Sequence, residues 1–232
     1  MSETQLKVGG LQPLTTLDYP DHLAAVVFCQ GCPMRCRYCH NPELLPRSGV
    51  SRIPWDEVLA FLGSRRGLLD GVVFSGGEPT QQRVLEDAIR EVRAMGFEIG
   101  LHTSGVYPRR LQRLLPLLDW VGLDLKALPE HYPALTGMPG SGALAWRSAR
   151  LLEAYGRPYQ LRTTYHPSLM SAAQRRMLKR LLVDFPLAEH VWQTCRTEHS
   201  LDVRLLAYPV TNSVPFSASE RDRREDVFRR QW

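Results

Sequence analysis

The sequence predicts an α/β protein whose parallel sheet curves into a partial (β/α)6 barrel. Short apolar segments rich in β-branched residues alternate with longer amphipathic segments through most of the 232 residues. A strand that is repeatedly followed by a helix gives parallel strands joined by right-handed crossovers. Because six such units are too few to close a barrel of eight, we expect a partial barrel or a strongly curved open sheet.

The expected strands are short, apolar and bounded by glycine, proline or polar residues. The first precedes a cysteine-rich loop, and the second runs directly into a Gly-Gly-Glu sequence. The six segments span 23–28, 70–74, 97–102, 119–125, 159–165 and 190–193.

Amphipathic segments between these strands predict five helices. Pro54 suits the first turn of the first helix, because the missing amide proton has no partner there in any case. Gly96 and Gly156 follow the second and fourth helices, where glycine commonly ends a helix. The expected helices span 54–66, 82–95, 108–118, 143–155 and 171–185.

The composition of the chain predicts one folded domain followed by a polar C-terminal tail. We expect a single domain over 1–200 and a tail over 201–232, because the last stretch is rich in Arg, Asp and Glu and contains Pro209 and Pro215. The arginines of that tail stand among acidic residues, so it contributes only +1 of the net charge of +5, and it lacks an interleaved aromatic pattern of the kind that stacks on bases. We therefore expect no nucleic-acid partner.

Hydropathy and cysteine usage indicate the compartment. No apolar run approaches the roughly 20 residues that span a bilayer, and the first residues lack the pattern of a signal peptide. Four of the five cysteines crowd between Cys29 and Cys39, which favours metal binding over a disulfide framework. We expect a cytoplasmic protein that does not associate with membranes.

Three cysteines carry the main chemical signal. Cys32, Cys36 and Cys39 follow the spacing C-x3-C-x2-C on one short loop, close enough to hold a single iron–sulfur cube. A cube has four irons, so three thiolates leave one iron open. An amine and a carboxylate of a small ligand can chelate that iron, as a substrate fills the open position of a catalytic metal site.

Further polar motifs follow the other strands. Ser75-Gly76-Gly77-Glu78-Pro79 follows the second strand, His102-Thr103-Ser104-Gly105 the third, and Asp124-Leu125-Lys126 the fourth. The carboxyl ends of parallel strands meet at one edge of the sheet, where ligands of α/β proteins bind. We expect these motifs and the cysteine loop to form one site.

The spacing and the aromatic residue before the last cysteine resemble the signature of the radical S-adenosylmethionine (SAM) superfamily. Five motifs together resemble the glycyl-radical-enzyme activases. They are the Ser75–Pro79 and Asp124–Lys126 motifs named above, with Asp18-Tyr19-Pro20, Gln30-Gly31-Cys32-Pro33 and Tyr38-Cys39-His40-Asn41-Pro42. Within these activases the chain is most similar to those of anaerobic ribonucleoside-triphosphate reductase. The resemblance covers roughly residues 11–193, in order and in spacing.

The resemblance implies a TIM-like partial barrel with a [4Fe-4S] cluster on Cys32, Cys36 and Cys39. S-adenosyl-L-methionine would bind the unique iron, with Tyr38 beside its adenine. Gly76 and Gly77 would let the backbone pass close to the ligand, and Glu78 would accept a hydrogen bond from the methionyl ammonium.

Four more residues complete the expected cofactor site. Lys126 would balance the methionyl carboxylate, and Asp124 would hold Lys126 or a ribose hydroxyl. A plain salt bridge between Asp124 and Lys126 is the alternative. Thr103 and His166 end two strands on the same edge, and for His166 a structural, hydrogen-bonded role is equally open.

The resemblance also implies the reaction. A reduced flavodoxin or ferredoxin-type donor would supply an electron through the cluster to SAM, giving methionine and a 5'-deoxyadenosyl radical. That radical would take a hydrogen atom from a backbone glycine of anaerobic ribonucleoside-triphosphate reductase. We expect no catalytic residue beyond cluster and cofactor.

The chain departs from some activases in two ways. His102 stands where some of them carry an acidic residue that helps to bind a monovalent cation, so we expect no cation. Only a short loop follows Cys39, where longer activases insert a ferredoxin module, so we expect no second cluster.

Several alternatives stay open. One is that the glycyl-radical partner is of the formate-lyase type. Another is that the chain is a small-molecule radical SAM enzyme such as a deazapurine synthase. A structural zinc site that includes Cys29, or a ferredoxin-like electron carrier, is the non-enzymatic alternative. We expect Cys29 and Cys195 to be buried structural thiols rather than ligands.

Overall fold

The protein is described here by a computed structural model that covers residues 5–48, 51–157, 159–198 and 200–207. Its seven strands form one sheet in the order of the chain, from β1 to β7. β1 pairs antiparallel with β2, and each later pair is parallel. The strands are β1 (Val8–Thr15), β2 (Ala24–Cys29), β3 (Gly71–Gly76), β4 (Glu98–Thr103), β5 (Trp120–Asp124), β6 (Tyr159–Tyr165) and β7 (Ala188–Thr194).

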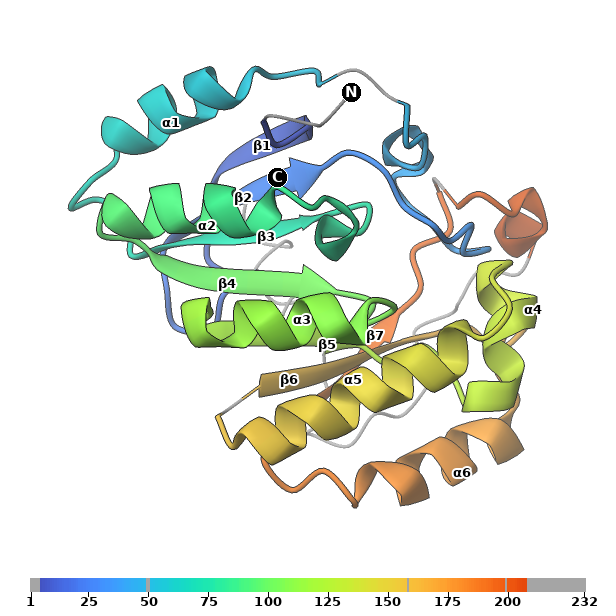
Figure 1. Cartoon of the computed structure of the whole chain (residues 1–232). Coiled ribbons are helices and arrows are strands. Elements are labelled where there is room, and N and C mark those ends of the chain that lie inside the picture. Colours follow the sequence, from blue (N-terminus) through green and yellow to red (C-terminus); the bar gives the residue numbers. More distant parts are fainter. Residues whose placement is uncertain (1–4, 49–50, 158, 199, 208–232) are drawn as a thin grey trace.

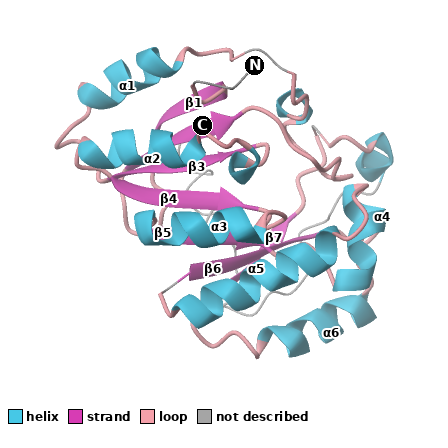
Figure 2. Cartoon of the chain, in the orientation of Figure 1, coloured by secondary structure: helices cyan, strands magenta, loops and turns pink. Residues whose placement is uncertain are grey.

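Helices cover one face of this sheet, as α2, α3 and α5 do in front of the strands in Figures 1 and 2. Each expected helix is present; four are slightly shorter than expected, whereas the fourth begins two residues earlier, at Ser141. The third ends early because Pro116 has no amide proton to donate, and a 3-10 turn continues from Leu115 to Leu117. The helices are α1 (Trp55–Gly63), α2 (Leu85–Ala94), α3 (Pro108–Leu114), α4 (Tyr132–Thr136), α5 (Ser141–Tyr155) and α6 (Ala172–Leu182).

Alternation along the strands separates a core face from a polar face. Successive side chains of a strand point to opposite sides, so Leu101, Leu123 and Leu161 pack under the helices as part of the main core. The residues that follow them, His102, Asp124 and Arg162, point to the other face. That face also carries a small apolar cluster of Tyr19, Ala24, Val26 and Val73, with Phe28 and Trp120 packed against it.

The predicted partial barrel is confirmed, with two additions. The six expected strands are the parallel strands β2 to β7, and β1 is an extra edge strand. Sequence patterns missed β1 because Gly9, Gly10 and Pro13 are poor strand formers. They missed α4 because its five residues are too few for a helical period to show.

Part of the expected tail packs on the domain. A 3-10 turn spans Val203–Ala207, and the Leu205 side chain is 1% exposed within the main core. In Figure 1 the orange segment after β7 runs beside the blue loop that carries the cysteines. Residues 208–232 lie outside the described residues, so the boundary between domain and tail stays a prediction.

Candidate cofactor site

The carboxyl ends of β2 to β5 bring the predicted motifs together. Gly76 at the end of β3 is the register partner of Cys29 at the end of β2. The amide of Glu78 donates to the carbonyl oxygen of Gly31 at 2.9 Å, which joins the Gly-Gly-Glu turn to the start of the cysteine loop. On the far side of that loop, the Lys126 ammonium lies 5.5 Å from the centre of the Tyr38 ring.

The three expected cluster ligands share one small apolar cluster. Cys36 is buried with Met34 and Val106, and Cys32 and Cys39 pack against them. The Cys39 amide donates to the Cys36 carbonyl at 3.0 Å, so a tight turn sets the spacing of the last two thiols. Burial raises the pKa of Cys32 to about 12 and also raises the pKa of Cys36 and Cys39. Without a metal the three thiols are therefore protonated, and they must lose their protons when they bind one.

Within the described ranges, no three His, Cys, Asp or Glu side chains gather closely enough to hold one metal ion. A cube makes a different demand, because three thiolates bind three separate irons rather than converging on one ion. Three soft donors come from one short loop, and beside them the buried Tyr38 hydroxyl has no hydrogen-bond partner among the described residues. This arrangement fits an iron–sulfur cube with a ligand beside it.

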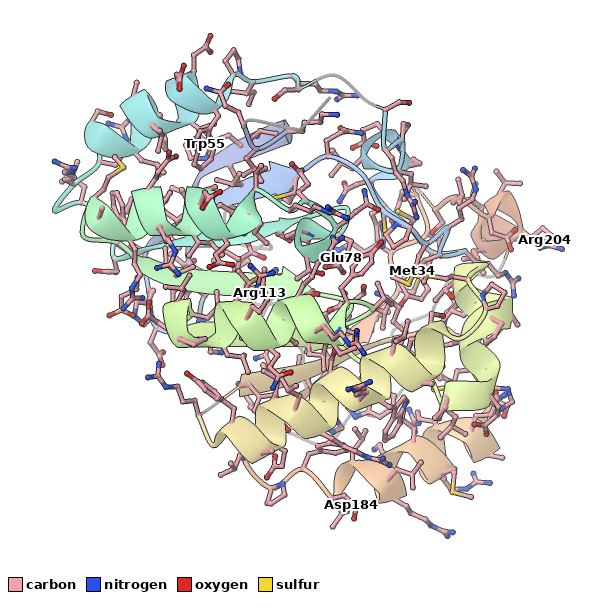
Figure 3. The ribbon with its side chains drawn as sticks, in the orientation of Figure 1. Met34, Trp55, Glu78, Arg113, Asp184 and Arg204 are labelled. Atoms are coloured by element: carbon pink, nitrogen blue, oxygen red, sulfur yellow. The ribbon has the colours of Figure 1, made fainter. Side chains whose placement is uncertain are left out.

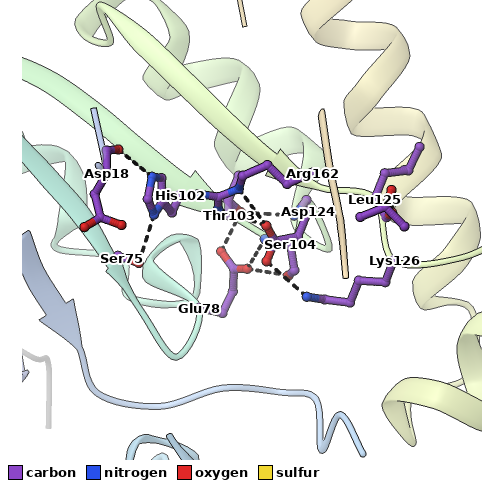
Figure 4. Close-up of polar contacts among 12 residues, drawn as sticks. Asp18, Ser75, Glu78, His102, Thr103, Ser104, Asp124, Leu125, Lys126 and Arg162 are labelled. Carbon is purple, nitrogen blue, oxygen red and sulfur yellow. Dashed lines mark hydrogen bonds and ion pairs between the residues drawn. The ribbon is translucent and has the colours of Figure 1, made fainter. Parts of the chain in front are cut away.

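Glu78 is fully buried, and both of its carboxylate oxygens are used (Figure 4). One oxygen accepts from the Thr103 hydroxyl at 2.8 Å and from the Thr80 amide at 3.1 Å. The other accepts from the Ser104 amide at 2.8 Å and also contacts the Ser104 hydroxyl. Glu78 thus fixes the end of β4 against the turn after β3. Its expected bond to the methionyl ammonium, and the cofactor contact of Thr103, stay predictions.

The two glycines are required by the cysteine loop itself. Gly76 has a φ of +110°, and a Cβ there would lie 2.5 Å from the Cys29 amide nitrogen. A Cβ on Gly77 would overlap the Gly31 carbonyl oxygen. This close approach joins two loops of the chain, and the expected approach to the cofactor stays a prediction.

A charged trio lies next to the Cys36 and Tyr38 side of the loop. The Asp124 carboxylate accepts from the Lys126 ammonium at 3.1 Å through one oxygen. Its other oxygen accepts from the Arg162 guanidinium at 2.9–3.0 Å. Figure 4 shows the carboxylate between these two cations. The expected salt bridge between Asp124 and Lys126 is present, and Arg162 is an addition that sequence patterns missed.

The trio is a desolvated charge network. The Lys126 and Arg162 side chains are 9% and 6% exposed, whereas that of Asp124 is 35% exposed. Burial alone would raise the pKa of Asp124, but Lys126 and Arg162 hold it well below its usual range. Burial would lower the pKa of Lys126, but Asp124 raises it well above its usual value. The trio therefore carries one net positive charge beside the thiols.

The two histidines on this edge have structural partners. His102 contacts the Ser75 hydroxyl at 3.3 Å and the Asp18 carbonyl oxygen at 2.8 Å, and its ring meets Trp120 edge-on. His166 is fully buried and accepts from the Ser168 amide at 3.1 Å, which shapes the turn after β6. A cofactor contact of His166 stays a prediction.

The remaining thiols are core residues. Cys29 is fully buried in the main core, and burial raises its pKa. Cys195 is 3% exposed in the same cluster and donates to the Arg196 carbonyl at 3.4 Å. Both placements match those expected of structural thiols. That neither thiol is a cluster ligand stays a prediction.

The fold and this edge define an α/β partial barrel with a three-cysteine loop at the carboxyl ends of its strands. Residues 26–171, more than half of the chain, match the model of the radical SAM superfamily. The chain belongs to that superfamily, whose members use a [4Fe-4S] cluster and SAM. This confirms the family and the two cofactors that the motifs predicted.

Curated relatives narrow the comparison. The chain is 35% identical over 131 residues to a putative glycyl-radical enzyme activating enzyme of Methanocaldococcus jannaschii, covering 54% of this chain and 52% of that protein. It is 32% identical over 171 residues to the pyruvate formate-lyase-activating enzyme of Staphylococcus aureus, covering 68% and 67%. The chain therefore spans about half the length of the first of these relatives. The expected resemblance to glycyl-radical-enzyme activases is confirmed.

Solved structures support the fold. SuiB of Streptococcus suis, crystallised with S-adenosylmethionine, aligns with a TM-score of 0.60 at 16% identity, over 77% of this chain and 44% of SuiB. The protein anSMEcpe with bound AdoMet aligns with a TM-score of 0.56 at 20% identity, over 74% of this chain and 53% of anSMEcpe. Among the described residues, no helix is both long and apolar enough to cross a bilayer.

Proposed function

We propose that the chain is a radical SAM activase that reductively cleaves SAM at a [4Fe-4S] cluster held by Cys32, Cys36 and Cys39. The observation that supports this most is the joint placement of the three thiols, Glu78 and the Asp124 trio at one edge of the sheet. We place this activity in the cytoplasm, where thiols remain reduced.

The cluster and SAM supply the radical chemistry, and the residues of the chain hold and orient them. The positive trio beside Cys36 and Tyr38 suits an anionic carboxylate, and Lys126 is its best-placed donor. Thr103 and Glu78, joined by a hydrogen bond of 2.8 Å, form the polar wall of the site. Gly76 and Gly77 keep this wall against the cysteine loop.

For the substrate, we propose a backbone glycine of anaerobic ribonucleoside-triphosphate reductase, with a reduced flavodoxin or ferredoxin-type protein as electron donor. The motifs at Asp18-Tyr19-Pro20 and Tyr38-Cys39-His40-Asn41-Pro42 support this class of activase. The sheet does not close on itself, since β1 and β7 are its two edges, and we propose that a peptide loop of the partner reaches the site from this open side.

A second candidate substrate is a glycyl-radical enzyme of the formate-lyase type. The observation that favours it is the identity of 31–32% to relatives named pyruvate formate-lyase-activating enzymes. The activase chemistry is the same for both substrates, so only the recognition of the partner distinguishes them.

The first experiment tests the cofactors. After anaerobic reconstitution we expect four irons and four sulfides per chain, and cleavage of SAM to methionine and 5'-deoxyadenosine that requires a reductant. One zinc per chain without cleavage would refute the proposal.

The second experiment tests the substrate. The reduced, reconstituted chain is incubated with SAM and either partner, and glycyl radical is counted by electron paramagnetic resonance. We expect a signal on the reductase that is absent when its radical-site glycine is changed to alanine. A signal on the formate lyase alone would select the second candidate.

A further inference from the structure

The cysteine loop is held from two sides by main-chain contacts at alternate residues. On one side, the amides of Arg35 and Arg37 donate to carbonyl oxygens at the end of α4, those of Thr136 at 2.8 Å and Leu135 at 3.0 Å. Arg37 lies between Cys36 and Cys39, so its position affects both thiols. Its carbonyl and side chain face the second side.

That second side is the strap, which we define as residues 200–207. The Asp202 amide donates to the Arg37 carbonyl oxygen at 2.8 Å, and the Asp202 carboxylate accepts from the Arg37 guanidinium, also at 2.8 Å. One residue of the strap thus binds both the backbone and the side chain of one loop residue. The Asp202 side chain is 9% exposed and that of Arg37 is 34% exposed, so the pair is partly shielded from water.

The strap has its own anchors. Leu205 is 1% exposed in the main core, and its amide donates to the Asp202 carbonyl oxygen at 3.0 Å. Arg204 donates to both carboxylate oxygens of Asp202 at 2.8 and 2.9 Å, and its own side chain is 78% exposed. Figure 3 shows Arg204 at the outer edge of the molecule, at the same end as Met34 of the cysteine loop. Leu205 therefore anchors the strap in the core, whereas Arg204 binds Asp202 from its exposed side.

We propose that Asp202 is a positioning residue for the cluster ligands: through Arg37 it holds the segment between Cys36 and Cys39 in the shape that binds the cluster. The carboxylate also offsets the charge of the Arg37 guanidinium, which belongs to the segment between Cys36 and Cys39. This inference rests on the proposed cluster, but its structural part concerns the loop alone.

The structural part is tested on the full chain without metal, by hydrogen exchange of the peptide that covers residues 33–40. Asp202→Ala is expected to speed exchange there about threefold to tenfold, the effect of losing a charge-assisted hydrogen bond. Arg204→Ala is the matched control, since it removes a partner of Asp202 that does not touch the loop. We expect it to change this exchange by less than about twofold.

The functional part is tested after reconstitution. Asp202→Ala and Arg37→Ala are each expected to speed iron release to a chelator, and the double variant to add little, because both remove the same contact. Asp202→Ala alone is expected to raise the reduction potential of the cluster, since an unneutralised Arg37 favours its more negative, reduced form. If Asp202→Ala does not fold, Arg37→Ala tests the contact from the loop side.

Exchange at residues 33–40 that is unchanged in Asp202→Ala, or equally faster in Arg204→Ala, would overturn the positioning role. Iron release and potential equal to those of the parent chain would overturn its link to the cluster. A parent chain that binds no iron but shows the expected exchange would instead refute the proposed function and leave the loop contact standing.

Discussion

Asp124 and Arg162 are register partners on β5 and β6, and the Arg162 guanidinium binds the Asp124 carboxylate at 2.9–3.0 Å. The same carboxylate binds Lys126 through its other oxygen. Two cations on neighbouring strands therefore share one anion at the edge where the cofactor is expected. The pairing keeps Lys126 charged in a largely buried position, which an isolated ammonium would not tolerate.

Removal of Arg162 is expected to destabilise the fold. Arg162→Ala leaves Asp124 with Lys126 alone and empties a buried volume, so we expect a loss of about 1–3 kcal/mol, below the usual range for buried pairs because Asp124 is partly exposed. Arg93→Ala breaks the more exposed pair with Asp119 and is expected to cost less than about 1 kcal/mol. Urea unfolding measures both. Equal losses would show that the trio is an ordinary surface network.

The pH dependence of stability follows from the lowered pKa of Asp124. Its pKa is depressed in the folded chain by Lys126 and Arg162, against the effect of burial. The stabilisation is therefore complete above the unfolded value of about 3.9 and is lost as the pH falls towards the folded value. We expect the difference in unfolding free energy between the parent chain and Asp124→Asn to shrink from pH 6 towards about pH 3. A constant difference would contradict this assignment.

Local patterns were enough to place most elements and the edge where the motifs meet. Strand-like segments are followed by glycine-rich or charged motifs, and the parallel topology alone brings those motifs together. Arg162 was missed because its role depends on the register between β5 and β6, which only the folded sheet sets. A charged residue in a strand of otherwise uncharged residues was the available signal.

Asp202 was missed for a related reason. It lies 165 residues from Arg37 in a segment whose composition is typical of a tail, and no local pattern reports so distant a contact.

For Gly76 and Gly77 the motif was found, but its contact partner was not. The sequence showed that a close approach was needed, but the approach in the structure is to Cys29 and Gly31 of the same chain.

Two glycines with similar φ angles allow the cost of backbone strain to be measured separately from the cost of steric overlap. Gly76 has a φ of +110° and no room for a Cβ, whereas Gly96 has a φ of +94° with no atom within 4 Å of that position. We expect Gly96→Ala to cost about 1 kcal/mol from backbone strain. Gly76→Ala is expected to cost at least 2 kcal/mol more, roughly the scale of overpacking, and to lower iron uptake on reconstitution. Thermal unfolding and iron analysis measure these effects, and equal costs would show that the loops can separate.

The choice of thiols is tested by a pair of alanine variants. Cys36→Ala removes a proposed ligand, so we expect iron to be lost and SAM cleavage to be abolished. Cys29→Ala leaves only a small gap in the core, with an expected cost of about 1 kcal/mol and most of the cleavage retained. Iron content and 5'-deoxyadenosine formation are measured for both. The reverse pattern would assign the ligand role to Cys29.

The Tyr38 hydroxyl is buried and has no hydrogen-bond partner within the described residues. Because an unpaired buried hydroxyl costs free energy, Tyr38→Phe is expected to leave the metal-free chain as stable as before or up to about 1 kcal/mol more stable. Tyr132→Phe is the matched control, since the Tyr132 hydroxyl accepts from the Lys126 amide at 2.8 Å, and its loss is expected to cost about 1 kcal/mol or more.

If the bound cofactor supplies the missing partner, Tyr38→Phe weakens the binding of SAM to the reconstituted chain, by about threefold to tenfold for one hydrogen bond. Equilibrium dialysis with labelled SAM measures this affinity, and denaturant unfolding measures the stability of the metal-free chain. The two readouts are expected to move in opposite directions, because the same hydroxyl is unpaired in one state and paired in the other. An unchanged affinity together with increased stability would show that SAM does not contact the Tyr38 hydroxyl. The unpaired hydroxyl would then only destabilise the fold.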